Sequence, residues 1–136
     1  MLRSALAILV GYLVLAVLIS GLFVAWALAS GYRHTPGTTP SLVFLVAAEL
    51  WGVLAATAGA WVTVRVARGN PWGHGAALLV VSWLMGYVSL IAGDGREPLA
   101  IQISHFVILL AGVLAGTAAG ARRGAPARDG SASAGP

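Results

Sequence analysis

Four long apolar stretches alternate along the chain with short segments that are rich in glycine and proline. A transmembrane helix needs about 20 apolar residues to cross a hydrocarbon core of roughly 30 Å. Membrane-spanning β-strands would instead alternate apolar and polar residues over about ten positions, and these stretches do not alternate. The pattern therefore predicts an all-α fold, a polytopic membrane bundle of four transmembrane helices within residues 1–120. The predicted helices cover residues 5–29, 42–64, 76–92 and 99–120.

The first stretch follows Arg3 and ends in small residues, as the apolar core of a secretory signal does. In a signal that core is about 7–15 residues long. Here it continues from residue 5 to residue 29. We therefore expect an uncleaved helix that stays in the membrane.

The arginines are distributed unequally between the two ends of the predicted helices. Because short connections make neighbouring helices antiparallel, one side of the membrane would carry six arginines and the other side two. The richer side holds Arg3, Arg65, Arg68, Arg122, Arg123 and Arg128, and the poorer side holds Arg33 and Arg96. Positive residues stay in the cytoplasm, so we expect a multi-pass protein of the cell (inner or plasma) membrane with both termini cytoplasmic. Residues 121–136 lack periodic apolar positions, which predicts a disordered basic cytoplasmic tail.

The composition agrees with a membrane protein and narrows its partners. Hydrophobic residues make up 59% of the chain and charged residues 9%, against about 25% charged in soluble domains, so the lipid bilayer is the expected surrounding. The net charge is +4, and the arginines that produce it lie at helix ends and in the tail. This distribution indicates contact with lipid headgroups and no nucleic-acid partner. The absence of cysteine excludes disulfide and thiolate chemistry. All eight basic residues are arginine, and alanine and glycine are abundant, which indicates a GC-rich, bacterial genome.

Glu49 is the one formal charge within the predicted spans, and an isolated charge near the bilayer centre is destabilising by at least about 2.5–3.5 kcal/mol. Its helix face carries mostly small residues, so we expect the carboxyl to face protein. The second and fourth predicted helices run in the same direction, and Glu49 and His105 each lie about 10 Å of helical rise from the outer ends of these helices. We expect them to interact at this depth. The polar layer predicted around them also includes Gln102, Ser89, Ser82 and Ser20.

Two interpretations of this polar layer remain open. Its side chains could satisfy one another and specify which helices pack together. Alternatively, the carboxyl and the imidazole could carry protons or bind a cation, because ionisable residues within membranes often mark such paths. One glutamate and one histidine are too few to ligate zinc, and no second histidine lies within a span to ligate haem. No metal, cofactor or enzymatic activity is predicted, and His34 and His74 are expected in loops without a role.

Small residues form two faces that predict close helix packing. Gly52, Ala56 and Gly59 lie on the Glu49 face of the second span, and Gly112, Gly116 and Gly120 repeat every four residues in the fourth. Small residues let helix backbones approach closely in membranes, so we expect these two faces to touch. The glycine face could instead join chains, which leaves a homo-oligomer or a larger membrane complex open.

The segment Ala48-Glu49-Leu50-Trp51-Gly52 resembles the Ala-Glu-x-x-Gly stretch of small multidrug-resistance transporters. This resemblance implies a four-helix protein that uses a membrane glutamate for protons and cationic drugs. That family carries its glutamate in the first helix, whereas Glu49 lies in the second. Over its full length the chain is similar in architecture and composition to small four-helix integral membrane proteins of GC-rich bacteria, which implies no particular activity.

Two functions are therefore carried forward from the sequence. The first expectation is a structural or accessory subunit of a membrane complex. The alternative is a small oligomeric proton-coupled transporter that uses Glu49, with His105 as a second group.

Overall fold

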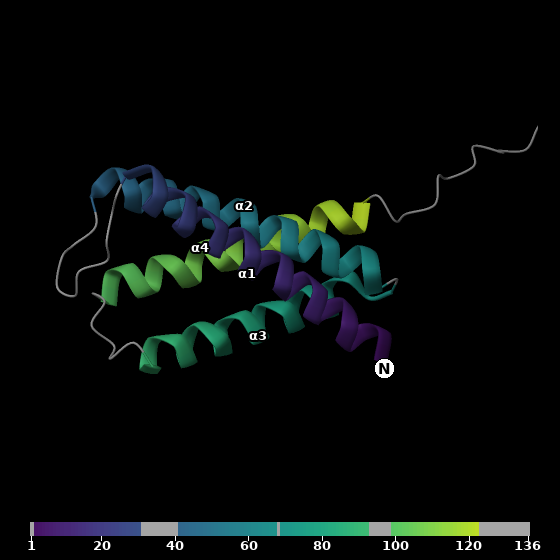
Figure 1. Ribbon diagram of the computed structural model, residues 1–136. Coiled ribbons are helices and arrows are strands. Elements are labelled where there is room, and N and C mark those ends of the chain that lie inside the picture. The colour runs from purple at the N-terminus through teal and green to yellow at the C-terminus, as the bar shows by residue number, and fades with distance from the viewer. Residues whose placement is uncertain (1, 31–40, 68, 93–98, 123–136) are drawn as a thin grey trace, which may run out of the picture.

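The computed structural model describes residues 2–30, 41–67, 69–92 and 99–122 of the chain. Within these ranges the chain forms helices and no strand, which confirms the predicted all-α fold (Figure 1). The helices are α1 (Leu2–Ser30), α2 (Leu42–Ala67), α3 (Pro71–Ala92) and α4 (Leu99–Arg122). Each is long and apolar enough to cross a membrane. The chain is therefore a small four-helix membrane protein.

The third helix begins at Pro71, five residues before the predicted start at residue 76. Proline fits the first helical position because an N–H there would have no partner within the helix. The side chain of Asn70 caps this end, since its Oδ1 accepts a hydrogen bond of 3.0 Å from the N–H of Gly73. The prediction that His74 lies in a loop was wrong, because α3 begins at Pro71 and includes His74. Its ring Nδ1 is 2.6 Å from the carbonyl oxygen of Asn70 in the first turn of α3.

The other helices also extend beyond their predicted bounds. Ser41 precedes α2, and its Oγ accepts a hydrogen bond of 3.2 Å from the N–H of Phe44. Arg65 and Arg122 lie in the last turns of α2 and α4, where basic side chains stabilise the negative end of the helix dipole. Helix α4 thus includes the first two residues of the predicted tail. The rest of the tail, residues 123–136, lies outside the described residues, as does His34.

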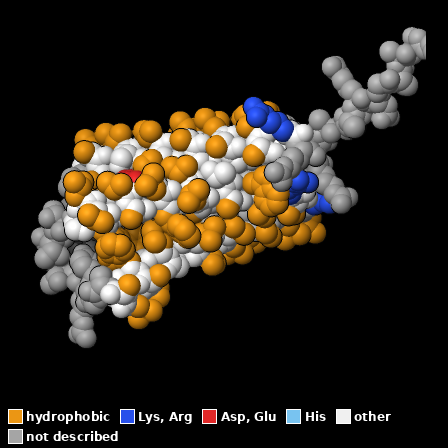
Figure 2. All heavy atoms as spheres, turned by 90° about the horizontal axis from the view of Figure 1, so that it is seen from above, with side chains coloured by type: hydrophobic (Ala, Val, Ile, Leu, Met, Phe, Trp, Pro, Cys, Tyr) orange, Lys and Arg blue, Asp and Glu red, His pale blue; other side chains and the backbone are white. Residues whose placement is uncertain are grey.

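The four helices run alternately in opposite directions, so their ends gather in two groups (Figure 1). The arginine end holds Arg3, Arg65 and Arg122, and the opposite end is called the Glu49 end. Figure 2 shows basic side chains gathered at one end of a largely apolar surface and the acidic side chain toward the other. Among the described residues that acidic side chain is Glu49.

Helices α2 and α4 pack closely through the repeated glycines of α4. A Cβ atom added to Gly112 would lie 2.6 Å from the Cβ of Ala56, and one added to Gly116 would lie 2.9 Å from the Cβ of Ala60. Gly120 makes the same kind of contact one turn further along. Real Cβ atoms do not approach so closely, so only glycine permits this backbone separation. The structure therefore confirms that the glycine face of α4 touches the small residues of α2.

A second close contact, which the sequence did not predict, joins α1 to α2. A Cβ added to Gly59 would lie 2.7 Å from the carbonyl oxygen of Gly11, and one added to Gly11 would lie 2.6 Å from the carbonyl oxygen of Gly59. The expectation of a single small-residue face on α2 was therefore wrong. Ala56 faces α4, and a Cβ added to Gly52 would also lie near α4, 3.5 Å from Ile108. Gly59 instead faces α1. A central helix packs on two sides, and its small residues divide between them.

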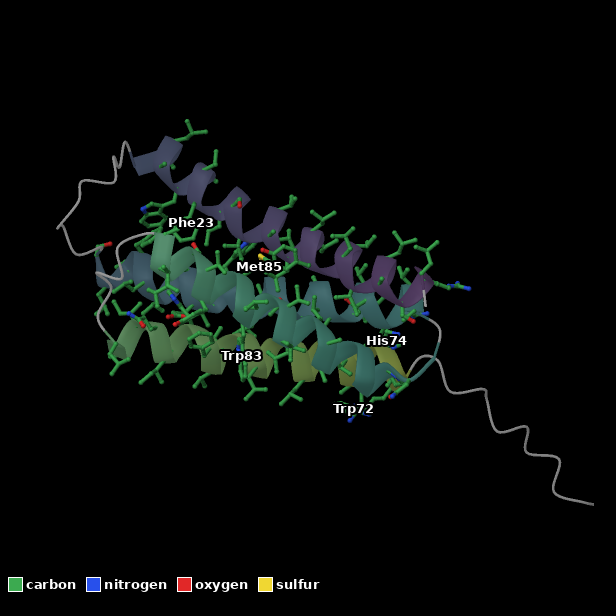
Figure 3. All side chains as sticks on the ribbon, turned by 90° about the horizontal axis from the view of Figure 1, so that it is seen from below. Phe23, Trp72, His74, Trp83 and Met85 are labelled. Atoms are coloured by element: carbon green, nitrogen blue, oxygen red, sulfur yellow. The ribbon has the colours of Figure 1, made fainter. Side chains whose placement is uncertain are left out.

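The buried core lies in the half of the bundle nearer the arginine end. It is formed by Leu15, Ala56, Ala60, Leu78 and Val113, with at least one residue from each helix. On α3, Gly75, Leu78 and Ser82 are buried, whereas every residue from 84 to 89 is exposed. Figures 1 and 3 together show the cause, because α1 diverges from α3 in Figure 1 and from α4 in Figure 3 toward the Glu49 end. The bundle is thus tightly packed at one end and open at the other.

Two alanine substitutions in α1 test the glycine contact. Gly11→Ala should destabilise the fold, because the new Cβ would lie 2.6 Å from the carbonyl oxygen of Gly59, whereas nothing lies within 4 Å of a Cβ at Gly21. Overpacking of this kind typically costs about 1–3 kcal/mol. Gly21→Ala should leave stability unchanged or raise it by about 0.5–1 kcal/mol through helix propensity. Thermal unfolding in detergent measures both, and equal melting temperatures would contradict the close approach of α1 and α2.

Candidate functional site

Glu49 and His105 occupy matching positions on two parallel helices. Helices α2 and α4 both begin at the Glu49 end, at Leu42 and Leu99. Each of the two side chains lies in the second turn of its helix, about 10 Å of helical rise from the first residue. The close packing of α2 on α4 then brings them to the same depth in the bundle.

The two side chains are in direct contact. The Nε2 atom of His105 lies 3.4 Å from the Oε1 atom of Glu49. The hydroxyl of Ser104 donates a hydrogen bond of 2.7 Å to the same carboxyl oxygen. Glu49, Ser104 and His105 are called the polar cluster below. The contact between Glu49 and His105 is the one expected from the sequence, whereas Ser104 was not expected.

Ser104 is suited to either protonation state of the carboxyl. Its Oγ lies 2.8 Å from the carbonyl oxygen of Ile101 as well as 2.7 Å from Oε1 of Glu49. A hydroxyl has one proton and two lone pairs, so it donates to one of these oxygens at a time. When Glu49 is ionised, Ser104 can donate to it. When Glu49 is protonated, Ser104 can donate to Ile101 and accept the carboxyl proton, so the α2–α4 hydrogen bond survives in both states.

The polar cluster is only partly covered by the rest of the chain. The side chain of Glu49 is 22% exposed and that of His105 is 53% exposed. The cluster lies in the half of the bundle where α1 diverges and where residues 84–89 of α3 are exposed. An imidazole exposed at this depth of a membrane-spanning helix meets hydrocarbon unless water or protein covers it.

The predicted polar layer across all four helices does not form. Ser20 is exposed, because it lies on the side of α1 opposite to the buried Gly11, and Ser89 is exposed on the unpacked part of α3. Ser82 is 7% exposed, and its Oγ has no hydrogen-bond partner among the described residues. Gln102 is half-buried in the first turn of α4, one turn before His105. The layer is therefore confined to α2 and α4.

Sequence reasoning missed Ser104 because it considered one face of α4 alone. At 100° per residue, Ser104 lies on the flank beside His105 and away from Gln102. A helix that packs against its neighbour at close distance presents two flanks to it, so adjacent residues can reach the same partner atom. Gly112 and Gly116 already indicated close packing of this helix, and from that packing Ser104 could have been predicted as a second partner of Glu49.

The cluster offers few ligands for a metal. No group of three or more His, Cys, Asp or Glu side chains that could hold a metal ion occurs among the described residues. What the arrangement offers chemically is a carboxyl, an imidazole and a hydroxyl in contact, which can exchange protons or hydrogen-bond with a polar group of another molecule.

Comparison with protein-family models, with curated proteins and with solved structures finds no match to this chain. The local resemblance of the segment around Glu49 to small multidrug-resistance transporters, and the inferred bacterial origin, therefore remain expectations from the sequence.

A double-mutant cycle tests the contact between α2 and α4. Glu49→Gln and His105→Ala should combine non-additively in the free energy of unfolding, because each removes the other's partner. The coupling should be about 0.6 kcal/mol for a hydrogen bond in a membrane and larger for an ion pair. Reversible unfolding in detergent measures it. Glu49→Gln combined with Val107→Ala is the matched control, because Val107 is an exposed apolar residue of the same helix. Zero coupling for both pairs would mean that the two side chains do not interact.

Proposed function

We propose that the chain is a structural or accessory subunit that joins a larger membrane assembly through the Glu49 end of its bundle. The observation that carries this proposal is the imidazole of His105, which is 53% exposed within a membrane-spanning helix. The partner would be another membrane protein or further copies of this chain.

Lipid can cover apolar side chains, but it offers an imidazole no hydrogen bond. A polar side chain left unpaired in hydrocarbon is destabilising, and polar side chains in membranes therefore usually face other protein or a water-filled cavity. His105 lies in the open half of the bundle, in which residues 84–89 of α3 are exposed as well. A partner helix packed against the Glu49 end of the bundle would cover the imidazole of His105.

Selective loss of the assembly tests this proposal. The wild-type chain, purified in mild detergent from its native membrane, should have an intact mass above the 13.8 kDa of one chain. His105→Leu should shift it toward the single chain, because leucine removes the hydrogen-bonding group and leaves an apolar side chain that lipid can cover. Val107→Leu, a change at another exposed position of α4, should leave the assembly intact. A wild type of single-chain mass, or equal effects of both variants, would refute the role of His105.

The alternative is a small oligomeric transporter in which the polar cluster carries protons or binds a cation. The contact of 3.4 Å between His105 Nε2 and Glu49 Oε1 supports it, because both groups can gain or lose a proton. In sealed liposomes such a transporter would show a proton or cation flux that Glu49→Gln abolishes while the variant remains folded. Wild-type liposomes without flux would exclude the alternative and leave the accessory-subunit proposal standing.

The proposed orientation places the arginine end in the cytoplasm, and with it both termini. The support is the excess of arginines at that end, six against two along the sequence. The chain has no cysteine, so single cysteines report position directly. Thr38→Cys and Gly95→Cys should react with an impermeant thiol reagent in intact cells, whereas Asn70→Cys and Ser131→Cys should react only after lysis. The reverse labelling pattern would invert the orientation.

A further inference from the structure

His105 uses only one of its two ring nitrogens in the polar cluster. Its Nε2 lies 3.4 Å from Oε1 of Glu49. No hydrogen bond within the described part of the chain reaches its other ring nitrogen, Nδ1. The side chain is 53% exposed, so Nδ1 is left for a group that belongs to another molecule.

The membrane sets how many protons Glu49 and His105 carry together. A net charge on the pair would be strongly destabilising in hydrocarbon. Two forms of the pair have none, a protonated carboxyl beside a neutral imidazole and a carboxylate beside an imidazolium. Both forms hold two titratable protons in total. They therefore differ only in where one proton lies between Oε1 and Nε2.

Both forms leave a proton on Nδ1 of His105. In an imidazolium each ring nitrogen carries a proton. In the neutral pair the carboxyl O–H is the stronger donor and the imidazole nitrogen the stronger acceptor, so the favoured hydrogen bond runs from Glu49 to a bare Nε2. The single ring proton is then on Nδ1. The nitrogen that has no partner within the described chain is therefore an N–H donor.

The depth of His105 argues against lipid as the acceptor for this N–H. Helix α4 has 24 residues and is about 36 Å long, so a span centred in a hydrocarbon core of roughly 30 Å extends only slightly beyond it at each end. His105 lies about 10 Å of helical rise from the first residue of α4, which places it within the hydrocarbon. Acyl chains offer no acceptor at that depth, and the lipid oxygens lie nearer the surface.

We propose that the Nδ1–H of His105 donates a hydrogen bond to an uncharged oxygen on a membrane-spanning helix of the partner. An unpaired N–H in hydrocarbon is destabilising, whereas a side-chain amide or hydroxyl oxygen at the same depth would accept it. A carboxylate on the partner would give the three groups together a net negative charge, so the acceptor is neutral. This hydrogen bond requires a partner at the Glu49 end and therefore rests on the proposed function, to which it adds the chemistry of the contact.

Two substitutions separate the roles of the two ring nitrogens. The side-chain amide in His105→Asn lies at the position of Nδ1 and ends short of Glu49, whereas the amide nitrogen in His105→Gln lies at the level of Nε2 and leaves no polar atom at Nδ1. Each chain is purified in mild detergent from its native membrane, and dissociation of the assembly on dilution is followed by intact mass. His105→Gln should weaken the assembly by about threefold, the factor expected for one hydrogen bond in a membrane. His105→Asn should stay close to the wild type.

Stability of the dissociated chain should follow the opposite order. His105→Asn loses the contact with Glu49, so its melting temperature should fall below that of His105→Gln, which keeps a donor at the level of Nε2. This reversal separates a role of Nδ1 in the partner contact from a general effect of His105 on the fold.

The outcomes distinguish this hydrogen bond from the assembly itself. An assembly that His105→Gln retains in full, or that His105→Asn weakens as much as His105→Gln, would overturn the hydrogen bond and leave the assembly standing. A wild type of single-chain mass would refute both. Nitrogen-15 NMR of the histidine-labelled wild-type assembly, with the His105 signals assigned from their loss in His105→Gln, should show a protonated Nδ1. A bare Nδ1 would overturn the proposal whatever the variants do.

Discussion

The close approach of helix backbones is the constraint on which the rest of this structure depends. Within lipid, apolar side chains gain little by moving from lipid to a protein interior, so helices associate mainly through van der Waals contact and hydrogen bonds. Glycine, which has no Cβ, lets two helix backbones approach closely enough for such contact. Gly112 and Gly116 seat α4 on α2, and Gly11 and Gly59 seat α1 on the other side of α2. Helix α2 is therefore the central element, and the register of both neighbours is set by positions where a Cβ would collide.

This packing also decides where the polar cluster lies and how it is covered. The glycine contacts are concentrated toward the arginine end, and the buried core lies there with them. Because α1 crosses obliquely and leaves α3 uncovered toward the Glu49 end (Figures 1 and 3), the cluster occupies the open half of the bundle. The same register that brings His105 to Glu49 therefore leaves the imidazole half exposed. Stability and the candidate site are thus separated along the length of the helices.

Much of this could be read from the sequence, because transmembrane helices are specified by length and hydropathy and small residues mark their contacts. The four helices and the meeting of Glu49 with His105 followed from such arguments. The division of Ala56 and Gly59 between two neighbours did not, because a helical wheel identifies a face but not how many helices it contacts. Ser20 and Ser89 were assigned to the polar layer by depth alone, and depth does not report the divergence of α1. The third helix was predicted to begin at residue 76 and not at Pro71, although proline is favoured at the first position of a helix.

The hydrogen bonding of Ser104 favours a structural role for the polar cluster over transport. A transporter that couples to protons needs its contacts to change when a proton binds, so that the change can move one helix relative to another. Ser104 can bond Glu49 in both protonation states, because its hydroxyl can reverse direction between Glu49 and Ile101. The glycine contacts of α4 oppose sliding along α2, because a shift that puts a larger residue in the place of Gly112 or Gly116 would bring its Cβ against Ala56, Ala60 or the backbone of α2. A proton that binds at Glu49 therefore leaves α2 and α4 joined, and any movement linked to it would have to arise in the less tightly packed α3 or in a partner that covers His105.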